Sequence, residues 1–364
     1  MSRIAFLNQS MSLGGAEKMM AFVIRSVAPL FEEVYLIQFT EGKGDYDLPQ
    51  NIKYISLGGN DSKLTIIGKL GLFISRIKRI RTILREHRID LVCSFGFFFT
   101  FMAVLSVRRT QAKVLASERR SPEDDGFIWG KISKWSYSRC LRVVFQLQEA
   151  SDYYISIPAK KKIVIPNPYL SRESGLNYDH QIVRKEIAMA AARLEFVKGF
   201  DIGIRAMSIV VNRHPEYKLV IYGKGDFNSS YGDLINNLGL SNIVSYKGYS
   251  KYILNDILES EIFLLPSRVE GIPNMLLEAM GVGMPCVATN CRPGGAKLLL
   301  GDNEYGLLVD NEDYIDVANA IIQLIEDPAF LMNMSEKAKL VRERFSEEII
   351  SKKWVTCFKE AIEN

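Results

Sequence analysis

The chain has 364 residues, 48% of them hydrophobic, and a mean hydropathy of +0.02. This length and composition are those of a soluble globular protein with room for two domains, and they exclude a chain embedded largely in a membrane. The charge is uneven: residues 1–170 carry 25 Lys and Arg against 15 acidic residues, net +10, and residues 171–364 carry 21 against 27, net −6. Two domains with different partners are therefore expected.

The sequence also indicates a cellular compartment. The number of cysteines is odd and no C-x-x-C pair occurs, which is typical of a reduced cytosolic protein: Cys93, Cys140, Cys286, Cys291 and Cys357. The apolar run at 4–7 is too short for a signal peptide. The longest apolar stretch, 95–107, is shorter than the roughly 20 residues that a membrane-spanning helix needs. We therefore expect a cytoplasmic protein.

In the first half, strand-like segments alternate with helix-like segments, which predicts a parallel sheet with helices on both faces. Strands are expected at 4–8, 34–39, 52–57, 91–95 and 113–117, and further elements at 127–140, 143–145 and 163–165. A glycine-rich turn opens a helix at 16–28, and another helix is expected from residue 149. Pro166 and Pro168 would stop any regular element, so we place the domain junction there.

A long helix is expected at 63–87. One stripe of apolar residues recurs every three or four positions and predicts the buried face: Ile66, Leu70, Phe73, Ile77, Ile80 and Leu84. We expect a second stripe on the opposite face: Leu72, Arg76, Arg79 and Ile83. This second stripe fits an ordinary solvated helix face and equally a surface that meets anionic lipid headgroups or a pyrophosphate. An aromatic run at 97–101 fits a core segment or the lining of an acceptor channel.

The second half restarts the alternation, with strands expected at 185–191, 219–222, 243–246, 262–265, 286–289 and 306–309. Arg193 and Lys198 follow the first of these strands. Two cations at the carboxyl end of a strand suit a diphosphate, although by themselves they fit solvated loop charges better.

The stretch from Leu265 to Asn290 is the most informative in the chain. A short apolar strand ends at Pro266, a polar turn follows, and Asn274 can cap a helix that begins near Met275. Gly281 and Gly283 are expected to end this helix, and a second strand comes next. The free N–H groups at a helix start suit a phosphate. Two carboxylates, Glu270 and Glu278, lie eight positions apart, and a carboxylate can accept hydrogen bonds from neighbouring sugar hydroxyls.

This stretch closely resembles the E-x7-E signature of retaining glycosyltransferases of family 4, which have the GT-B fold. Further segments support the resemblance in the same order along the chain: LGGAE, IPNP, ARLEFVKGF, YGKGD, KGY and GLLV. The resemblance covers most of the chain. It implies two Rossmann-like domains facing each other across a cleft: residues 1–168 binding the acceptor, residues 169–345 binding a nucleotide sugar, and a helix at 346–364 packing back on the first domain.

The resemblance also implies a reaction. A sugar would move from a nucleotide-sugar donor, with a UDP-sugar favoured, to a glycan or polyprenyl-pyrophosphate-linked acceptor in bacterial cell-surface polysaccharide or glycan assembly. The anomeric configuration would be retained and no metal cofactor would be needed. An anionic membrane surface is a further expected partner, placing the enzyme at the cytoplasmic face of the inner membrane. Nucleic acid is not an expected partner.

The family's motifs assign roles to residues of this chain. Arg193 and Lys198 would neutralise the donor diphosphate, and Glu270 would hold a hydroxyl of the transferred sugar. The remaining donor contacts would come from Gly14, Gly15, Gly248, Tyr249, Gly271, Ile272, Pro273, Asn274, Met275 and Glu278. Among these, Glu278 would hold the ribose hydroxyls. Glu118 and Arg119 would contact the sugar or the acceptor.

Two positions depart from the family pattern. Arg119 stands where many relatives carry a His that contacts the transferred sugar, and Ala192 replaces the Gly that commonly precedes the loop Arg. The histidines have no metal-like spacing: His87, His180 and His214. Two other functions were weighed, a nucleotide-sugar epimerase on the same fold and a non-catalytic scaffold. An epimerase would need acid–base groups at the sugar ring, and the chain shows no such cluster. A scaffold would usually have lost the loop Arg, the Lys or one of the two carboxylates, and all four are present here: Arg193, Lys198, Glu270 and Glu278.

Overall fold

The computed structural model describes residues 2–11, 15–40, 46–58, 65–119, 126–170, 176–181 and 184–363. The chain divides into two compact units. The first unit comprises Met1–Asn167 together with Glu348–Asn364, and the second comprises Pro168–Glu347. The sequence analysis placed the corresponding junctions after residues 168 and 345.

The first unit is built on a parallel sheet whose described strands run in the order β3-β2-β1-β4-β5-β6-β7. Their bounds are β1 (Arg3–Asn8), β2 (Glu33–Gln38), β3 (Lys53–Ser56), β4 (Leu91–Phe95), β5 (Lys113–Ser117), β6 (Arg142–Phe145) and β7 (Lys162–Val164). The central strands are almost continuously apolar and buried along their length, as a sheet covered on both faces requires. The parallel sheet predicted for this half is thus confirmed.

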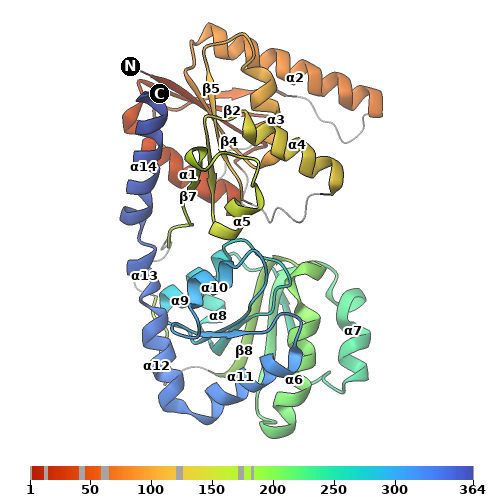
Figure 1. The fold of residues 1–364 in the computed structure, drawn as a ribbon. Helices are drawn as coiled ribbons and strands as arrows, with labels where there is room; N and C mark the ends of the chain where they lie inside the picture. Colours follow the sequence, from red (N-terminus) through yellow and green to blue (C-terminus); the bar gives the residue numbers. More distant parts are fainter. Residues whose placement is uncertain are drawn as a thin grey trace. The chain divides into compact units, whose positions relative to one another are not determined.

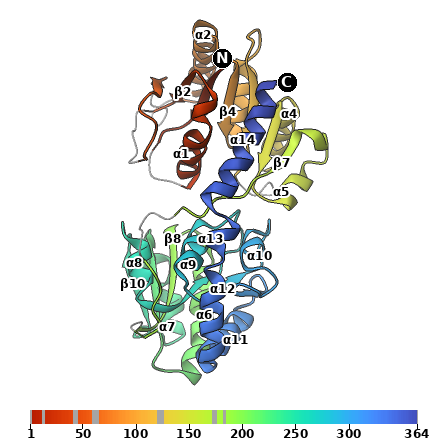
Figure 2. The ribbon, with the colours of Figure 1, turned by 90° about the vertical axis from the view of Figure 1, so that its left-hand side faces the viewer.

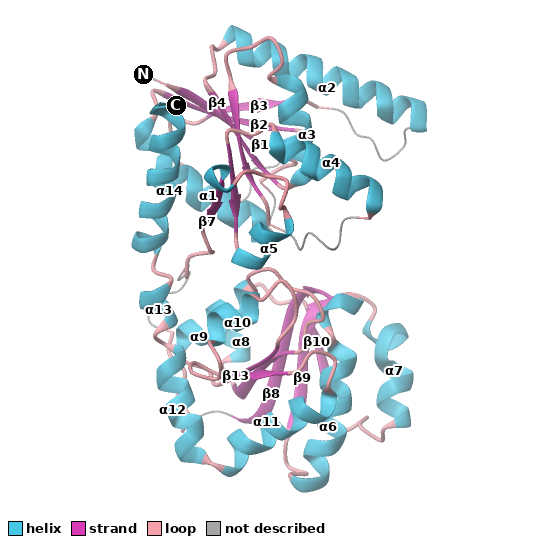
Figure 3. Ribbon diagram, in the orientation of Figure 1, coloured by secondary structure: helices cyan, strands magenta, loops and turns pink. Residues whose placement is uncertain are grey.

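Helices lie on both sides of this sheet (Figure 1, Figure 3). They are α1 (Gly15–Val27), η1 (Ala28–Leu30), α2 (Ile66–Glu86), α3 (Phe97–Ser106), α4 (Phe127–Ser138), α5 (Gln148–Tyr153), η3 (Ala159–Lys161) and α14 (Glu347–Glu363). The last helix of the chain, α14, lies along the first unit (Figure 2). Its Trp354 ring stacks on Phe95 at 6.3 Å, and its Phe358 ring lies 6.3 Å from Phe6 of β1.

The helix α2 buries part of the stripe predicted for its core face, because Ile80 and Leu84 are buried as expected. Arg76 and Ile83, expected on the outer face, are buried, whereas Leu70, expected in the core, is 58% exposed. Burial of Arg76 is possible because its guanidinium stacks on the Phe39 ring at 4.6 Å and donates to the carbonyl oxygen of Gly58 at 3.4 Å. The buried face therefore overlaps the predicted one but is rotated from it, because an arginine at a buried position interrupts the apolar pattern.

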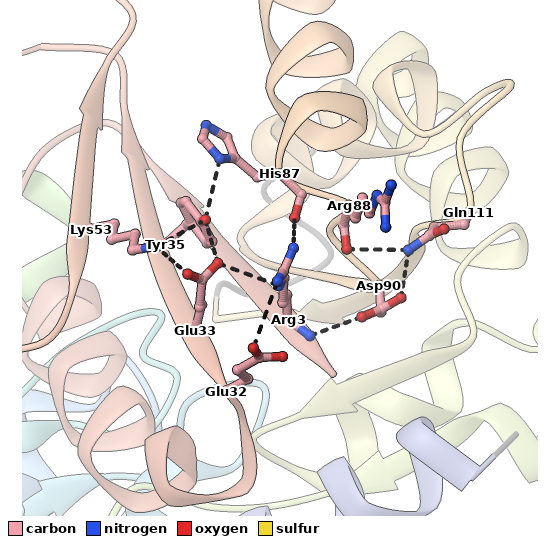
Figure 4. Close-up of polar contacts among 9 residues, drawn as sticks. All are labelled: Arg3, Glu32, Glu33, Tyr35, Lys53, His87, Arg88, Asp90 and Gln111. Atoms are coloured by element: carbon pink, nitrogen blue, oxygen red, sulfur yellow. Dashed lines mark hydrogen bonds and ion pairs between the residues drawn. The ribbon is translucent and has the colours of Figure 1, made fainter. Parts of the chain in front are cut away.

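A polar network ties together the amino ends of β1, β2 and β3 (Figure 4). Glu33 accepts hydrogen bonds from the Tyr35 hydroxyl at 2.6 Å and from the Lys53 ammonium, and it pairs with Arg3 at 3.4 Å. The Tyr35 ring also packs on His87, which follows α2. The network therefore connects this edge of the sheet to the end of a covering helix.

The second unit contains a parallel sheet whose described strands run in the order β10-β9-β8-β11-β12-β13. Their bounds are β8 (Arg184–Arg193), β9 (Lys218–Lys224), β10 (Val244–Gly248), β11 (Ser260–Leu265), β12 (Cys286–Thr289) and β13 (Leu307–Val309). The helical segments are η4 (Phe196–Lys198), α6 (Phe200–Arg213), α7 (Phe227–Asn237), α8 (Ile253–Ile257), α9 (Asn274–Val282), α10 (Gly295–Leu300), α11 (Tyr314–Glu326), α12 (Pro328–Ala338) and α13 (Val341–Arg344).

The strand order of the second unit reverses direction between β8 and β11. From β8 the chain builds outward through β9 to β10, and it then returns to place β11 on the other side of β8. The connections that leave these two strands diverge at their carboxyl ends, which is where open parallel sheets bind ligands. The loops after β8 and β11 are therefore the first place to look for a site.

Candidate functional site

The loops after β8 and β11 bring together two residues that the sequence analysis singled out. Lys198 ends the short η4 turn that follows β8, and Glu270 lies in the loop that follows β11. The Lys198 ammonium donates to Glu270 Oε2 at 2.5 Å, and both side chains are partly buried. A cation and a carboxylate thus neutralise each other at the switch point of the sheet. The ammonium retains two further N–H donors and the carboxylate retains its second oxygen, so each group can still contact a ligand.

Close backbone packing holds the two loops in place. Gly199 has a φ of +64°, and a Cβ on it would lie 1.9 Å from the carbonyl oxygen of Pro266. A Cβ on Gly295 would lie 1.6 Å from the carbonyl oxygen of Gly271. Since a side chain at either position would collide with main chain, only glycine allows these approaches. The backbone N–H of Glu270 also donates to the carbonyl oxygen of Arg292 at 3.1 Å.

Arg268 fastens the loop after β11 to the η4 turn. Its guanidinium binds both carboxylate oxygens of Asp201 at 2.8 Å, stacks on the Phe196 ring at 3.9 Å and donates to the Phe196 carbonyl oxygen at 3.0 Å. Desolvation opposes ionisation of Asp201, but the hydrogen bonds and charge of Arg268 outweigh it and lower the pKa of Asp201. Lys198 lies two residues beyond Phe196, so Arg268 helps to position it.

Sequence reasoning assigned no role to Arg268, although it lies two residues before Glu270. Its signal in the sequence is weak, because the partner Asp201 is 67 residues away. The pairing depends on the adjacency of β8 and β11, which only the fold reveals.

Arg193 is the last residue of β8 rather than part of the following loop. Its guanidinium pairs with Glu195 at 3.0 Å, and both side chains are largely exposed. The structure therefore places Arg193 at the same carboxyl edge of the sheet as Lys198. Its contact with a diphosphate remains a prediction.

The helix α9 begins at Asn274, and Pro273 occupies the capping position before it. The prediction that Asn274 is the capping residue is therefore wrong. Gly281, which was expected to end the helix, lies within it, and a Cβ there would lie 1.9 Å from the Tyr169 ring. Gly283, with a φ of +92°, ends the helix as predicted.

The other predicted donor contacts surround this helix start. Gly271, Ile272 and Pro273 form the chain between Glu270 and α9, and Met275 and Glu278 lie in the helix itself. Ile272 and Pro273 are buried, whereas the other three are partly exposed. Uncompensated N–H groups at a helix start favour an anion, so this segment has the chemistry expected of a phosphate site.

Two further predicted residues lie at the carboxyl end of β10, the edge strand of the sheet. Gly248 ends this strand with a φ of +76°, a conformation that favours glycine. The Tyr249 ring is 62% exposed. An exposed ring can stack on a base, but a contact of Tyr249 with a nucleotide stays a prediction.

In the first unit, Gly15 is the exposed first residue of α1, and Gly14 lies outside the described residues. Glu118 is buried, where it accepts hydrogen bonds from the Tyr137 hydroxyl and, at 2.7 Å, from the backbone N–H of Arg119. These contacts occupy the carboxylate inside the domain. The predicted contact of Glu118 with sugar or acceptor remains a prediction.

The Arg119 guanidinium lies between two aromatic rings, 5.2 Å from the centre of Phe95 and 5.3 Å from that of Trp354. It also donates to Asn167 Oδ1 at 3.1 Å. Burial lowers the pKa of Arg119 to about 10. In these contacts Arg119 attaches α14 to the first unit's sheet, a structural role that the sequence did not suggest. A sugar contact of Arg119 is still a prediction.

Within the part of the chain that the structure describes, no three His, Cys, Asp or Glu side chains gather in an arrangement that could hold a metal ion. Among the same residues, no helix is both long and apolar enough to cross a membrane. Neither observation tests the predicted cofactor requirement or the predicted membrane attachment.

Known proteins resemble the chain in sequence and in fold. Residues 179–341 match the family described as glycosyl transferases group 1. An uncharacterized glycosyltransferase of Haemophilus influenzae is 24% identical over 374 residues, covering 97% of this chain and 99% of that protein. An undecaprenol-linked-glycan alpha-1,4-N-acetyl-D-galactosaminyltransferase of Campylobacter jejuni is 23% identical over 361 residues, covering 98% of each.

Among solved structures, the Anabaena protein HepE in complex with UDP and glucose superposes with a TM-score of 0.79 at 20% identity. The superposition covers 99% of this chain and all of that one. At this level of identity the likeness establishes the fold, that of the GT-B glycosyltransferases, over both units.

Proposed function

We propose a specific reaction for this chain, which is a glycosyltransferase of bacterial polysaccharide or glycan biosynthesis with a glycosyl transferases group 1 domain and the GT-B fold. The enzyme transfers a sugar from a UDP-sugar to a lipid-linked glycan and retains the anomeric configuration. HepE was solved with UDP, and the Campylobacter jejuni relative is named for an undecaprenol-linked acceptor. These two names support the choice of donor and acceptor.

The observation that carries the proposal is the Lys198–Glu270 ion pair at the switch point of the second sheet. A nucleotide sugar brings a diphosphate, which attracts a cation, and a ring of hydroxyls, which a carboxylate can accept from. The two halves of the pair thus match the two halves of the donor. Each group has hydrogen-bonding capacity left beside the ion pair, so the donor can meet both.

The proposed chemistry needs charge stabilisation more than proton transfer by a side chain. Arg193, Lys198 and the N–H groups at the start of α9 balance the charge that develops on the departing diphosphate. Glu270 orients the transferred sugar, and Glu278 holds the ribose. A phosphate oxygen of the leaving group takes the acceptor's proton on the same face of the sugar ring, which retains the configuration. The enzyme works without a metal cofactor at the cytoplasmic face of a membrane.

The test is transfer by the purified full-length chain from a panel of labelled UDP- and GDP-sugars to a polyprenyl-pyrophosphate-linked glycan. We expect a labelled lipid product with one UDP-sugar, and no product when the acceptor is omitted. NMR of the new linkage then gives its anomeric configuration. An inverted linkage would refute retention, and a strict requirement for GDP-sugar would refute the donor assignment.

The same assay separates the two alternative functions. An epimerase would convert the nucleotide sugar without any acceptor. A non-catalytic scaffold would give neither conversion nor transfer, although it could still bind nucleotide in a saturation-transfer NMR experiment. Only transfer that depends on the acceptor supports the proposed function.

A further inference from the structure

Among three neighbouring helices of the first unit, α2 and α4 carry positive charge, α3 carries no charged residue, and negative charge is almost absent. Together α2, α3 and α4 contain eight Lys and Arg but one acidic residue, Glu86, which ends α2. Over the whole chain, 46 basic residues face 42 acidic ones, so this imbalance is local. The helix α3 contacts both α2 and α4, and Figure 1 shows the three helices next to one another.

Large apolar side chains are exposed on the outer face of α2. Ile67, Leu70 and Ile74 are 84%, 58% and 45% exposed. Residues three and four positions apart share a face of a helix, so these three form one stripe. The buried side of α2 is marked by Arg76 and Ile80, which lie roughly opposite on the helix.

Aromatic rings continue this stripe across α3 to α4. Phe73 of α2 stacks on Phe101 of α3 at 5.8 Å, and Phe101 lies 5.9 Å from Trp135 of α4. Trp129 of α4 packs on Phe97 of α3 at 5.6 Å. Ile128, Trp129 and Trp135 are themselves exposed. We call this set, with the stripe on α2, the α2–α4 surface.

We propose that the α2–α4 surface docks the protein on an anionic lipid bilayer. Exposed Lys78 lies on the same face of α2 as Ile67 and Ile74, and exposed Lys131 lies on the same face of α4 as Ile128 and Trp135. Tryptophan and large aliphatic side chains are stable at the headgroup level, and nearby lysines attract anionic lipids. A protein partner would be expected to meet both signs of charge. A surface this rich in cations and nearly free of acids is complementary to an anionic leaflet.

This inference rests on the proposed function, because it identifies where the enzyme meets the membrane that carries a lipid-linked acceptor. It also corrects the surface expected from sequence. The contacts of Arg76 inside the first unit remove it from any lipid surface, and Ile67, Leu70 and Ile74 take the place of the predicted stripe.

The test is flotation of the full-length protein with vesicles of phosphatidylcholine alone or mixed with phosphatidylglycerol. We expect flotation with the mixed vesicles that weakens as salt rises. The double variant Lys78→Gln/Lys131→Gln should lower the partition coefficient on the order of 25-fold, since each lysine near an anionic surface contributes about fivefold. Ile67→Ser/Ile74→Ser should lower it as well, at every salt concentration.

Matched controls lie on other elements. Ile315 of α11 is 51% exposed, similar to Ile74, and Lys218 and Lys359 are exposed lysines outside the three helices. Ile315→Ser and Lys218→Gln/Lys359→Gln should float like the unmodified protein. Equal flotation with both kinds of vesicle, or equal losses in the controls, would overturn the proposal. So would gel filtration showing that Ile67→Ser/Ile74→Ser dissociates an oligomer without changing flotation.

Transfer to a water-soluble acceptor fragment tests the proposed function separately from the docking surface. The surface variants should transfer sugar to this fragment at the unmodified rate. Flotation without any sugar transfer would refute the proposed function and leave the docking surface standing. Transfer without flotation would refute the docking surface alone.

Discussion

At the scale of single residues, the Lys198–Glu270 pair has two consequences. Each side chain is partly buried and satisfied by the other, so removing one leaves the other as an unpaired charge. In a free enzyme this pairing keeps both groups oriented before the donor arrives. Variants of the two residues should therefore affect donor use and local stability together, and tests must separate the effects.

Lys198→Ala should slow sugar transfer on the order of 10²-fold, by analogy with the loss of one donor to a developing negative charge. Arg193→Ala should do the same with less effect on stability, because the Arg193 guanidinium is largely exposed. Steady-state kinetics with saturating acceptor measures the first effect, and thermal melting measures the second. Near-normal turnover in both variants would show that the donor diphosphate does not bind at this edge of the sheet.

Substitution of Glu278 should mainly weaken nucleotide binding, whereas substitution of Glu270 should mainly slow turnover. Glu278→Gln should raise the Kd for the nucleotide, because the amide replaces an acceptor-only group at the ribose. Glu270→Gln should lower kcat more than it weakens nucleotide binding, because its proposed partner is the transferred sugar. Calorimetry with UDP and kinetics with the UDP-sugar check the split. The opposite pattern would mean that the two roles are exchanged.

At the scale of elements, the loops of the second unit act as one assembly. Arg268, from the loop after β11, holds the η4 turn through Asp201 and the Phe196 ring. Gly199 lets the same turn approach Pro266. Lys198 is therefore positioned by contacts that are far apart in sequence and that form only when β8 and β11 pair.

Asp201→Asn should loosen this assembly and destabilise the second unit by about 2 kcal/mol, the usual contribution of hydrogen bonds to a charged group. The pKa of Asp201 is lowered in the folded protein. Its stabilisation is therefore present above the unfolded pKa, near 3.8, and is lost as the pH falls below it. Melting curves from neutral to acidic pH should show that difference shrinking, with Arg268→Gln behaving alike. A stability difference between the unmodified protein and Asp201→Asn that stays constant at all pH values would contradict a stabilising role of the Asp201–Arg268 ion pair.

The network in Figure 4 gives a second acid-sensitive element. The hydrogen bond from Lys53, followed by that from Tyr35, lowers the pKa of Glu33 from 4.5 to about 2. Its contribution to stability is therefore complete above pH 4.5 and is lost between pH 4.5 and about 2. Glu33→Gln should remove this part of the acid dependence and leave the rest, as followed by near-UV circular dichroism. An unchanged acid transition would show that the network adds no stability.

The two sheets were predictable because parallel strands alternating with helices leave a clear apolar pattern, as β1 and β11 do. The buried face of α2 was predictable only in part: Ile80 and Leu84 are buried as expected, but Arg76 is also buried, through a ring and a carbonyl that come from other elements. The start of α9 was predicted one residue too late, because Asn274 has the residue type of a helix cap but Pro273 takes that position. In the candidate site, the spacing of the motifs predicted Lys198 and Glu270. The role of Arg268 was not predictable, because its pairing with Asp201 depends on the adjacency of β8 and β11.

At the scale of the whole molecule, the charge separates along the chain as the proposed reaction requires. The basic residues of the first half serve, in our proposal, an anionic surface, while the more acidic second half places Arg193 and Lys198 at the carboxyl end of β8. In the proposed reaction, Lys198 and Arg193 would balance the charge of the leaving diphosphate, which a divalent ion balances in metal-dependent sites. The helix start of α9 adds a further fixed positive charge.

This arrangement predicts that transfer does not depend on a divalent metal. Activity should be the same with EDTA as with added Mg²⁺ or Mn²⁺, because protein cations stabilise the leaving diphosphate. The variants sharpen the test: if Lys198 supplies this charge, Lys198→Ala should gain activity from added Mg²⁺ while the unmodified protein does not. Product formation in metal-free buffer, followed by release of labelled UDP, measures both. Complete loss of activity in EDTA, restored by Mg²⁺ in the unmodified chain, would mean that a metal ion provides the charge here assigned to lysine and arginine.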